Sequence, residues 1–247
     1  MKIKVINPMK GDIVTQAMSK YCTDTGIEDV DFESLTEGPE IIYNRYDVAL
    51  AGPDTVRKVQ KAERDGYDAV TFTCHADPNL AACREGVHIP VLGLLETSAH
   101  FCAMLGTRFT ILSPNLAIKR WQEENIQKYG LTERLASVRL VKFPIPLDEV
   151  LRIASEKPRP KQVDELVEIT VAEAAKAVEE DDATAMVFGC GGFLYLEDEV
   201  SDRLKAGGYD VLVINPLLLT IEVAKALAKL GYRHSPAAYP YLEVVAV

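Results

Sequence analysis

Short apolar runs alternate along this chain with longer segments in which apolar residues recur every three or four positions. The short runs are enriched in Val and Ile, which is typical of buried parallel strands. They cover residues 3–7, 69–73, 90–94, 109–113, 137–143, 184–189 and 210–215. The longer segments predict helices at about residues 12–22, 48–65, 96–105, 115–129, 161–180, 197–206 and 217–230. Strands that alternate with helices in this way predict an α/β fold with parallel sheets.

The order of these elements occurs twice along the chain. IKVINP is followed by AVTFTC and then by PVLGL, and FTILSP is followed by AMVFGC and then by VLVINP. We therefore expect two pseudo-symmetric, doubly wound halves with parallel sheets and an active site in the cleft between them. The first half is expected to comprise residues 1–107 plus about 222–247, and the second half residues 108–221.

Each half places a cysteine directly after an equivalent buried strand. Ligands of doubly wound sheets bind beyond the carboxyl ends of the strands, so Cys74 and Cys190 are predicted to face one cleft from opposite sides. A single cysteine at the end of a strand is more often a small core residue than a catalyst. Two cysteines at equivalent points of a repeat favour function over packing.

A pair of thiols can invert a carbon acid without a metal or an organic cofactor. One thiolate removes the proton, and the other cysteine delivers a proton to the opposite face. The backbone N–H groups that follow the two thiols are placed to hold an enolate oxygen or a carbonyl. They belong to His75, Ala76, Gly191 and Gly192.

Other polar residues near the predicted cleft have less specific explanations. Asn7 and Ser113 end strands, where they either bind a substrate or simply begin a turn. His75 is expected to shape the pocket. A metal site or a Cys-His nucleophile pair is disfavoured, because no second ligand cluster is present and adjacent side chains diverge at a turn.

Composition narrows the class of partner. With 48% hydrophobic residues, 26% charged residues and a net charge of −10, the chain is typical of a soluble globular protein and not of one that binds nucleic acid. No apolar run approaches the roughly 18 residues of a membrane span, and MKIKVINP predicts a strand, not a signal peptide. Five cysteines without a C-x-x-C pair favour free thiols, so we expect a cytoplasmic protein that acts on a small molecule.

Several of these blocks resemble a known family. VINP, GPEIIYNRYDVALAGPDTV, DAVTFTCHADPNLAACRE, IPVLGLLETSAH, LGTRFTILSP and VFGCGGF, in this order, resemble the hydantoin and allantoin racemase branch of the aspartate/glutamate racemase superfamily. The resemblance implies two α/β halves related by a pseudo-twofold axis, cofactor-independent racemisation and assembly into homo-oligomers. It assigns the acid and base roles to Cys74 and Cys190, and it makes Asn7 and the backbone after each cysteine candidates for holding the substrate.

The chain departs from the pattern of that branch close to both cysteines. INPMKG stands where INPNTS is usual, TCHADP replaces ACFGDP, and GCGG replaces GCAG. These changes suggest a substrate with an additional anionic group, met by Lys10 or His75. The expected function is a racemase or epimerase of a small cyclic ureide or amino-acid derivative of the hydantoin or allantoin type. The alternatives are a maleate-type cis-trans isomerase, another lyase or isomerase of the superfamily acting on an acyclic dicarboxylate, or a non-catalytic metabolite-binding protein.

Overall fold

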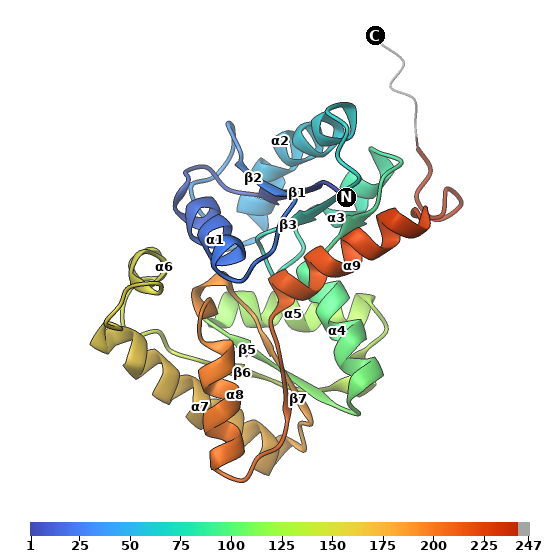
Figure 1. The fold of residues 1–247 in the computed structure, drawn as a ribbon. Coiled ribbons are helices and arrows are strands. Elements are labelled where there is room, and N and C mark those ends of the chain that lie inside the picture. The colour runs from blue at the N-terminus through green and yellow to red at the C-terminus, as the bar shows by residue number, and fades with distance from the viewer. Residues whose placement is uncertain (242–247) are drawn as a thin grey trace.

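The computed structural model describes residues 1–241 and contains two parallel, four-stranded sheets (Figure 1). The first sheet has the order β2-β1-β3-β4, and its strands are Val30–Ser34, Ile3–Asn7, Ala69–Phe72 and Val91–Leu92. The second sheet has the equivalent order β6-β5-β7-β8, with strands Leu135–Leu140, Phe109–Ser113, Ala185–Phe188 and Leu212–Ile214. The two orders confirm the predicted α/β class and the internal repeat.

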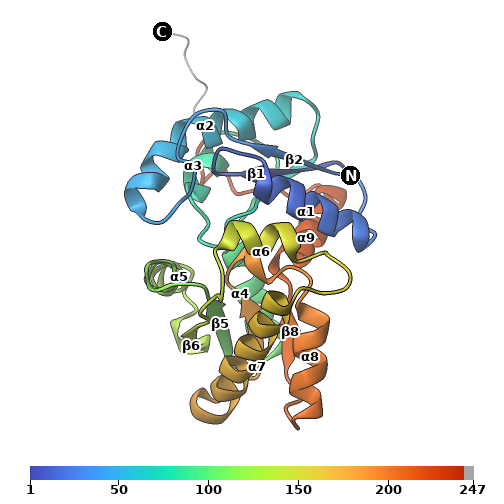
Figure 2. The same ribbon diagram turned by 90° about the vertical axis from the view of Figure 1, so that its left-hand side faces the viewer.

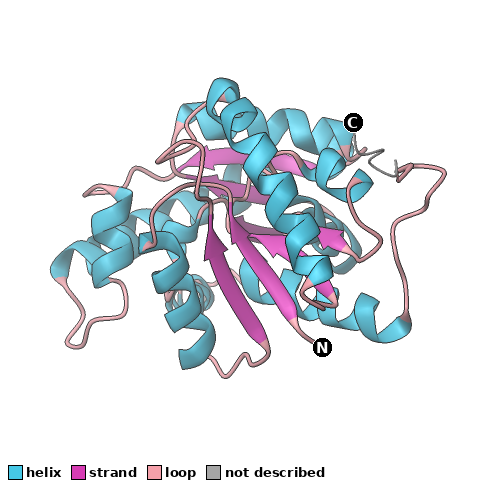
Figure 3. Ribbon diagram, turned by 90° about the horizontal axis from the view of Figure 1, so that it is seen from above, coloured by secondary structure: helices cyan, strands magenta, loops and turns pink. Residues whose placement is uncertain are grey.

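Helices cover both faces of the strands, as the view in Figure 3 shows. They are α1 (Ile13–Asp24), α2 (Arg45–Arg64), α3 (Leu80–Glu85), α4 (Leu94–Leu105), α5 (Leu116–Lys128), α6 (Leu147–Ile153), α7 (Lys161–Asp181), α8 (Glu197–Ala206) and α9 (Pro216–Leu230). Two 3-10 turns, η1 (Thr132–Arg134) and η2 (Gly191–Phe193), complete the regular structure. Because helices cover both faces, every residue of the central strands β3 and β7 is buried, which explains why their sequences are mostly apolar.

The sequence-based prediction missed three elements and shifted two. β2 was missed because it lies at a sheet edge and carries polar residues, and α3 and α6 were missed because they are short. The strand expected at residues 90–94 is reduced to β4, since α4 already begins at Leu94. The strand expected at 137–143 is β6, which begins and ends earlier.

Two helices exchange places between the halves. α4 follows the first sheet but packs on the second, where Leu95, Ala99 and Cys102 join one apolar cluster with strands β5 and β7. α9 follows the second sheet but packs on the first, where Ala224 contacts the cluster that contains Ile3. Division of the chain at residues 107 and 222 stays a prediction, and its last part, residues 242–247, lies outside the described residues.

The segment after α9 returns to the first half. Gly231, with a φ of 70°, ends the helix, and His234 Nε2 then accepts a hydrogen bond from the Val91 N–H at 2.9 Å. Arg84 Nη1 donates to Tyr239 Oη at 3.0 Å.

Across residues 1–241 no helix combines the length and the apolar character that crossing a membrane requires.

Helix α6 of the second half reaches across to α1 of the first (Figure 2). Leu147 and Leu151 of α6 pack with Met18 of α1 in one apolar cluster. α6 thereby closes one side of the space between the halves.

Candidate active site

A cavity of about 370 Å³ lies between the two halves, and both Cys74 and Cys190 line it. Cys74 follows β3 after one further residue, and Cys190 follows β7 in the same manner. The cysteines therefore stand at the carboxyl ends of equivalent strands, where parallel sheets bind their ligands. Both thiols are partly exposed to the cavity, whereas Cys22, Cys83 and Cys102 are buried elsewhere.

The environment of Cys74 favours the neutral thiol when no ligand is bound. Burial raises the pKa of Cys74 to about 12, and the nearby charge of Asp77 adds to this effect. The Ala76 N–H opposes it by hydrogen bonding to the sulfur. Cys190 also raises the pKa of Cys74 by Coulombic interaction, which is the behaviour of two thiols that share one site.

Cys190 is better able to carry a negative charge. Its Sγ accepts a hydrogen bond from the Gly192 N–H at 3.4 Å, because the side chain caps the turn η2. Burial raises the pKa of Cys190 to about 11, while the N–H groups of Gly191 and Gly192 lower it. Since two backbone donors face this sulfur and one faces Cys74, the thiolate is favoured at Cys190.

The two glycines after Cys190 bring the backbone close to the cavity. A Cβ at Gly191 would collide with Met18 Cε, and one at Gly192 would collide with Phe143 and Leu147. Both residues line the cavity, so their backbones, not side chains, form this part of the wall.

His75 is a buried, neutral residue held from both sides. Gln122 Nε2 donates to His75 Nδ1 at 3.2 Å, so the ring proton lies on Nε2, which is 3.2 Å from Ser98 Oγ. Ser98 Oγ in turn donates to the carbonyl of Leu94 at 2.6 Å. Burial lowers the pKa of His75 to about 3. His75 therefore shapes the site without bringing a positive charge to it.

Lys10 is the other cation suggested for an anionic substrate group. Of the described residues that line the cavity it is the one Lys or Arg side chain, and its Nζ is paired with Glu40 at 2.8 Å. Because Glu40 is exposed, this ion pair is weak, and recognition of an additional anionic group by Lys10 stays a prediction.

Asn7 and Ser113 are brought to the ends of equivalent strands but do not line the cavity. Asn7 is fully buried, and its amide accepts a hydrogen bond from Thr73 Oγ1 at 2.9 Å and donates to Ser34 Oγ at 3.3 Å. Ser113 is also fully buried and donates to the carbonyl of Asn115 at 3.4 Å. Direct binding of a substrate by either residue stays a prediction.

Much of the cavity wall is apolar, although Glu40, Tyr43, Asn115 and Asp148 also line it, and sequence reasoning did not identify the apolar residues. They come from α1, from the segment before α2, and from α5 and α6: Ile13, Val14, Met18, Ile42, Ile118, Leu147 and Leu151. The signal available in the sequence was weak, because Leu147 and Leu151 are spaced for one face of a helix too short to show a clear period.

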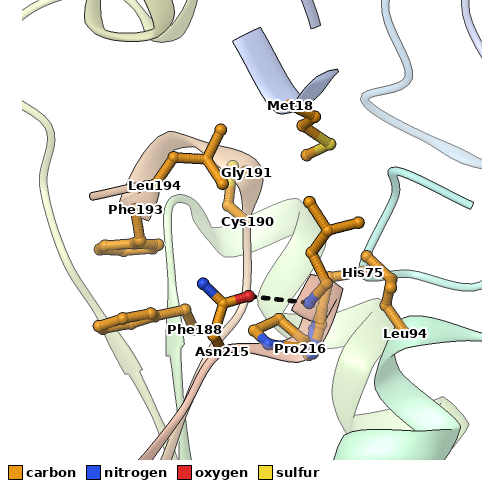
Figure 4. A pocket seen from close by; sticks show the side chains of 11 residues that line it. Met18, His75, Leu94, Phe188, Cys190, Gly191, Phe193, Leu194, Asn215 and Pro216 are labelled. Atoms are coloured by element: carbon orange, nitrogen blue, oxygen red, sulfur yellow. Dashed lines mark hydrogen bonds between the residues drawn. The ribbon is translucent and has the colours of Figure 1, made fainter. Parts of the chain in front are cut away.

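A second, much smaller apolar cavity lies behind Cys190 (Figure 4). Phe188, Phe193, Leu194 and the start of α9 line it, and Asn215 Oδ1 accepts a hydrogen bond from the Leu217 N–H at 3.0 Å. Its volume of about 20 Å³ is close to that of one water molecule. The larger cavity is therefore the one that can hold a substrate, and the small one keeps the back of the Cys190 thiol apolar.

No group of three or more His, Cys, Asp or Glu side chains within residues 1–241 is arranged to hold a metal ion.

Comparisons with known proteins agree with this geometry. The model of the family described as Asp/Glu/Hydantoin racemase matches residues 3–224. A hydantoin racemase of Paenarthrobacter aurescens is 30% identical over 242 residues, which cover 96% of this chain and 95% of that protein. A hydantoin racemase of Pseudomonas sp. (strain NS671) is 28% identical over 237 residues, 95% of this chain and 89% of the relative.

Solved structures share the fold. The allantoin racemase from Klebsiella pneumoniae superposes with a TM-score of 0.83 at 22% identity, covering 100% of this chain and 96% of the other. At 22% identity this superposition supports a shared fold, with the same arrangement of the two halves.

Proposed function

The chain belongs to the Asp/Glu/hydantoin racemase family and is an isomerase of the racemase type, and from this premise we propose that Cys74 and Cys190 together invert the stereocentre of a small cyclic ureide. The observation that carries the proposal is the placement of two thiols, at the ends of the equivalent strands β3 and β7, in the wall of one cavity.

Each turnover transfers one proton away from the substrate and one proton to it. The thiolate of one cysteine removes the hydrogen from C5 of the ring, and the electron pair of the C–H bond moves onto the adjacent carbonyl oxygen. Backbone N–H groups next to the thiols stabilise the resulting enolate. The thiol of the other cysteine then protonates C5 on the opposite face. The two cysteines end with exchanged protonation states, so the enzyme is ready for the opposite enantiomer.

We propose that Cys190 is the cysteine that ionises first and acts as the base in the first proton transfer. Two backbone N–H groups lower its pKa, whereas the thiol of Cys74 lies near the carboxylate of Asp77. The first productive complex is then formed with the enantiomer whose C5 hydrogen faces Cys190.

The lining of the cavity favours an uncharged ring with an apolar substituent. α1 and α6 present Ile13, Val14, Leu147 and Leu151 to the cavity. Burying an alkyl or aryl group against such side chains is favourable by about 25 cal/mol per Å². We therefore expect 5-alkyl and 5-aryl hydantoins to be better substrates than allantoin, whose 5-substituent is a polar ureido group. A dicarboxylate is disfavoured, because Glu40 and Asp148 line the cavity, Lys10 is the one Lys or Arg side chain among the described lining residues, and His75 is neutral.

The test is to incubate single enantiomers of allantoin and of several 5-substituted hydantoins with the protein in D₂O. Deuteration at C5 is followed by NMR, and loss of rotation is followed by polarimetry. We expect both with at least one hydantoin, and loss of inversion in Cys74→Ser and in Cys190→Ser. Cys83→Ser is the matched control, because Cys83 is buried in α3 away from the cavity. Inversion near the wild-type rate in both cavity variants would refute the assignment.

We also propose, from the family resemblance, that the chain works in the cytoplasm as a homo-oligomer. The five free thiols are compatible with a reducing compartment. Light scattering coupled to gel filtration measures the assembly directly, and a monomer at micromolar concentration would contradict this part of the proposal.

A further inference from the structure

One face of α5, in the second half, holds the loop that follows Cys74 in the first half. Gln122 Nε2 donates to His75 Nδ1 at 3.2 Å, and Asn125 Nδ2 donates to the carbonyl of Ala76 at 2.7 Å. Tyr129, the residue that caps the end of α5, donates from its hydroxyl to Asp77 Oδ2 at 2.9 Å. The spacing of three and then four residues puts all three side chains on one face of the helix.

These contacts match the loop residue by residue. His75, Ala76 and Asp77 follow Cys74 directly in the chain, and each receives one hydrogen bond from α5. His75, Ala76 and Asp77 are all buried, so water does not compete for these bonds. The loop is thus fixed along its length by a helix from the opposite half.

Gln122 also reaches the loop of the other thiol. The same Nε2 donates to the carbonyl of Gly189 at 3.0 Å, and Gly189 directly precedes Cys190. One fully buried amide group therefore joins the residue after one cysteine to the residue before the other. His75, Gln122 and Gly189 form a short connection between the two thiol loops.

The amide of Gln122 is not arranged for stability alone. Its Oε1 is buried and has no hydrogen-bond partner within the described part of the chain. A buried acceptor without a partner destabilises the folded state. Both hydrogen bonds that Gln122 Nε2 donates go to the two thiol loops, to His75 and to Gly189. This arrangement indicates a role in the active site and not in the packing of the core.

α5 is itself attached firmly to the first half. Trp121 is 9% exposed and packs into the apolar cluster of the first half, together with Phe72 and Ala76. Ile118, one turn earlier, packs against the same cluster. Movement of α5 relative to the Cys74 loop would have to disrupt this packing.

We propose that α5 acts as a brace that fixes the separation and orientation of the two thiols, with Gln122 as its principal positioning residue and Asn125 and Tyr129 as secondary ones. The inference rests on the proposed two-cysteine function. Inversion needs both sulfurs in line with C5 on opposite faces, and a misplacement of about 1 Å costs about 10²-fold in rate.

The test compares inversion with hydrogen exchange in Gln122→Met. When both thiols are in place, removal of the C5 hydrogen is followed by protonation on the other face. When the thiols are out of register, the first cysteine returns a solvent-derived deuteron to the same face, which gives exchange without inversion. In D₂O we expect inversion to fall about 100-fold in Gln122→Met, with exchange falling less, so that the ratio of exchange to inversion rises several-fold while KM changes little.

Two further variants keep the result interpretable. Gln127→Met makes the same substitution at an exposed position of the same helix and should leave both rates unchanged. Tyr129→Phe removes one hydrogen bond at nearly constant volume and should raise the ratio by a smaller amount, which keeps the proposal testable if Gln122→Met does not fold. An equal fall of exchange and inversion in Gln122→Met and Tyr129→Phe would overturn the proposal, because misfolding lowers both rates together.

A measurement without substrate separates this proposal from the proposed function. Alkylation of Cys74 by iodoacetamide, followed by peptide mass spectrometry, should be several-fold faster in Gln122→Met than in Gln127→Met, each normalised to cysteine-free peptides of the same digest. An unchanged rate would overturn the brace even if the wild-type protein racemises hydantoins. If the wild-type protein inverts no ring but Cys74 is still alkylated faster in Gln122→Met, the brace would stand and the proposed function would be refuted.

Discussion

Replacement of Gly189 by alanine tests the close packing behind Cys190. A Cβ at this position would lie 2.8 Å from Gln122 Nε2, 2.8 Å from the carbonyl oxygen of Leu112 and 2.9 Å from Ile111 Cγ2. The Leu112 carbonyl cannot move freely, because it accepts the Gly189 N–H at 2.9 Å. The backbone of the thiol loop, or Gln122, must therefore shift.

The magnitude follows from these contacts. Overpacking of a well-filled interior costs about 1–3 kcal/mol. Displacement of Gln122 would lose its hydrogen bond to the Gly189 carbonyl, which adds about 1 kcal/mol. After the gain of about 0.4–1 kcal/mol from loss of a glycine, we expect the free energy of unfolding to fall by about 2 kcal/mol. For a chain of this size each kcal/mol lowers Tm by about 2–4 °C, so the expected shift is about 4–8 °C.

Gly191→Ala is the matched control on the other side of Cys190. Its Cβ would meet Met18 Cε, the far end of a flexible side chain that can change rotamer. Neither glycine has a positive φ, so neither substitution strains the backbone dihedrals. Loss of glycine also reduces the entropy of the unfolded chain, which offsets about 0.4–1 kcal/mol in both variants. Gly191→Ala should therefore unfold close to the wild-type temperature.

The assay is thermal unfolding followed by far-UV circular dichroism at fixed protein concentration, without ligand. We expect Gly189→Ala to unfold well below both the wild type and Gly191→Ala. If the two variants unfold within about 2 °C of each other, a difference of less than about 1 kcal/mol, the inferred contact with Gln122 and Leu112 is wrong.

Three further predictions concern titration and reactivity. The pKa values of Cys190 and Cys74 are raised to about 11 and about 12, so kcat/KM should rise between pH 7 and pH 9, by at most about tenfold per pH unit. A pH-rate profile that is flat over this range would contradict the thiol assignment. Iodoacetamide should modify Cys190 faster than Cys74 at pH 8, because Cys190 ionises more readily, and the reverse order would refute Cys190 as the first base. The free energy of unfolding should fall on acidification from pH 6 to pH 4. His75 and His234, whose pKa values are lowered to about 3 and about 4 in the folded protein, take up protons on unfolding. Asp77, whose pKa is raised to about 6, releases one. The net uptake of about one proton corresponds to about 1.4 kcal/mol per pH unit, and urea unfolding that is independent of pH in this range would show that these shifts are absent.

Local sequence patterns were sufficient for the central strands. β1, β3, β5 and β7 are buried on both faces, so most of their residues are apolar and the strands stand out. β2 is half-buried at an edge, and its sequence VDFES has no unbroken apolar run. An edge strand is recognised by its pairing with a neighbour, and pairing is a tertiary property.

The positions of the two thiols followed from the repeat, since equivalent strands end at the same edge of their sheets. The sequence also suggested that His75 shapes the pocket, and in the structure it is buried and neutral. The contacts of Gln122, Asn125 and Tyr129 could not be predicted in this way. They join segments far apart in the chain, and a buried polar residue on an amphipathic helix does not show which loop it will meet.

The exchange of α4 and α9 between the sheets has a consequence for the order of folding. The apolar surface of the first sheet around Ile3 and Ala69 is covered by α9, which is synthesised after every other helix and strand described here. A nascent chain that ends before residue 216 therefore exposes this surface to water and to chaperones, although all four strands of the sheet are already complete. Loop closure over such a long separation is slow, so we expect the N-terminal half to become protease-resistant only after the C-terminal helix has docked.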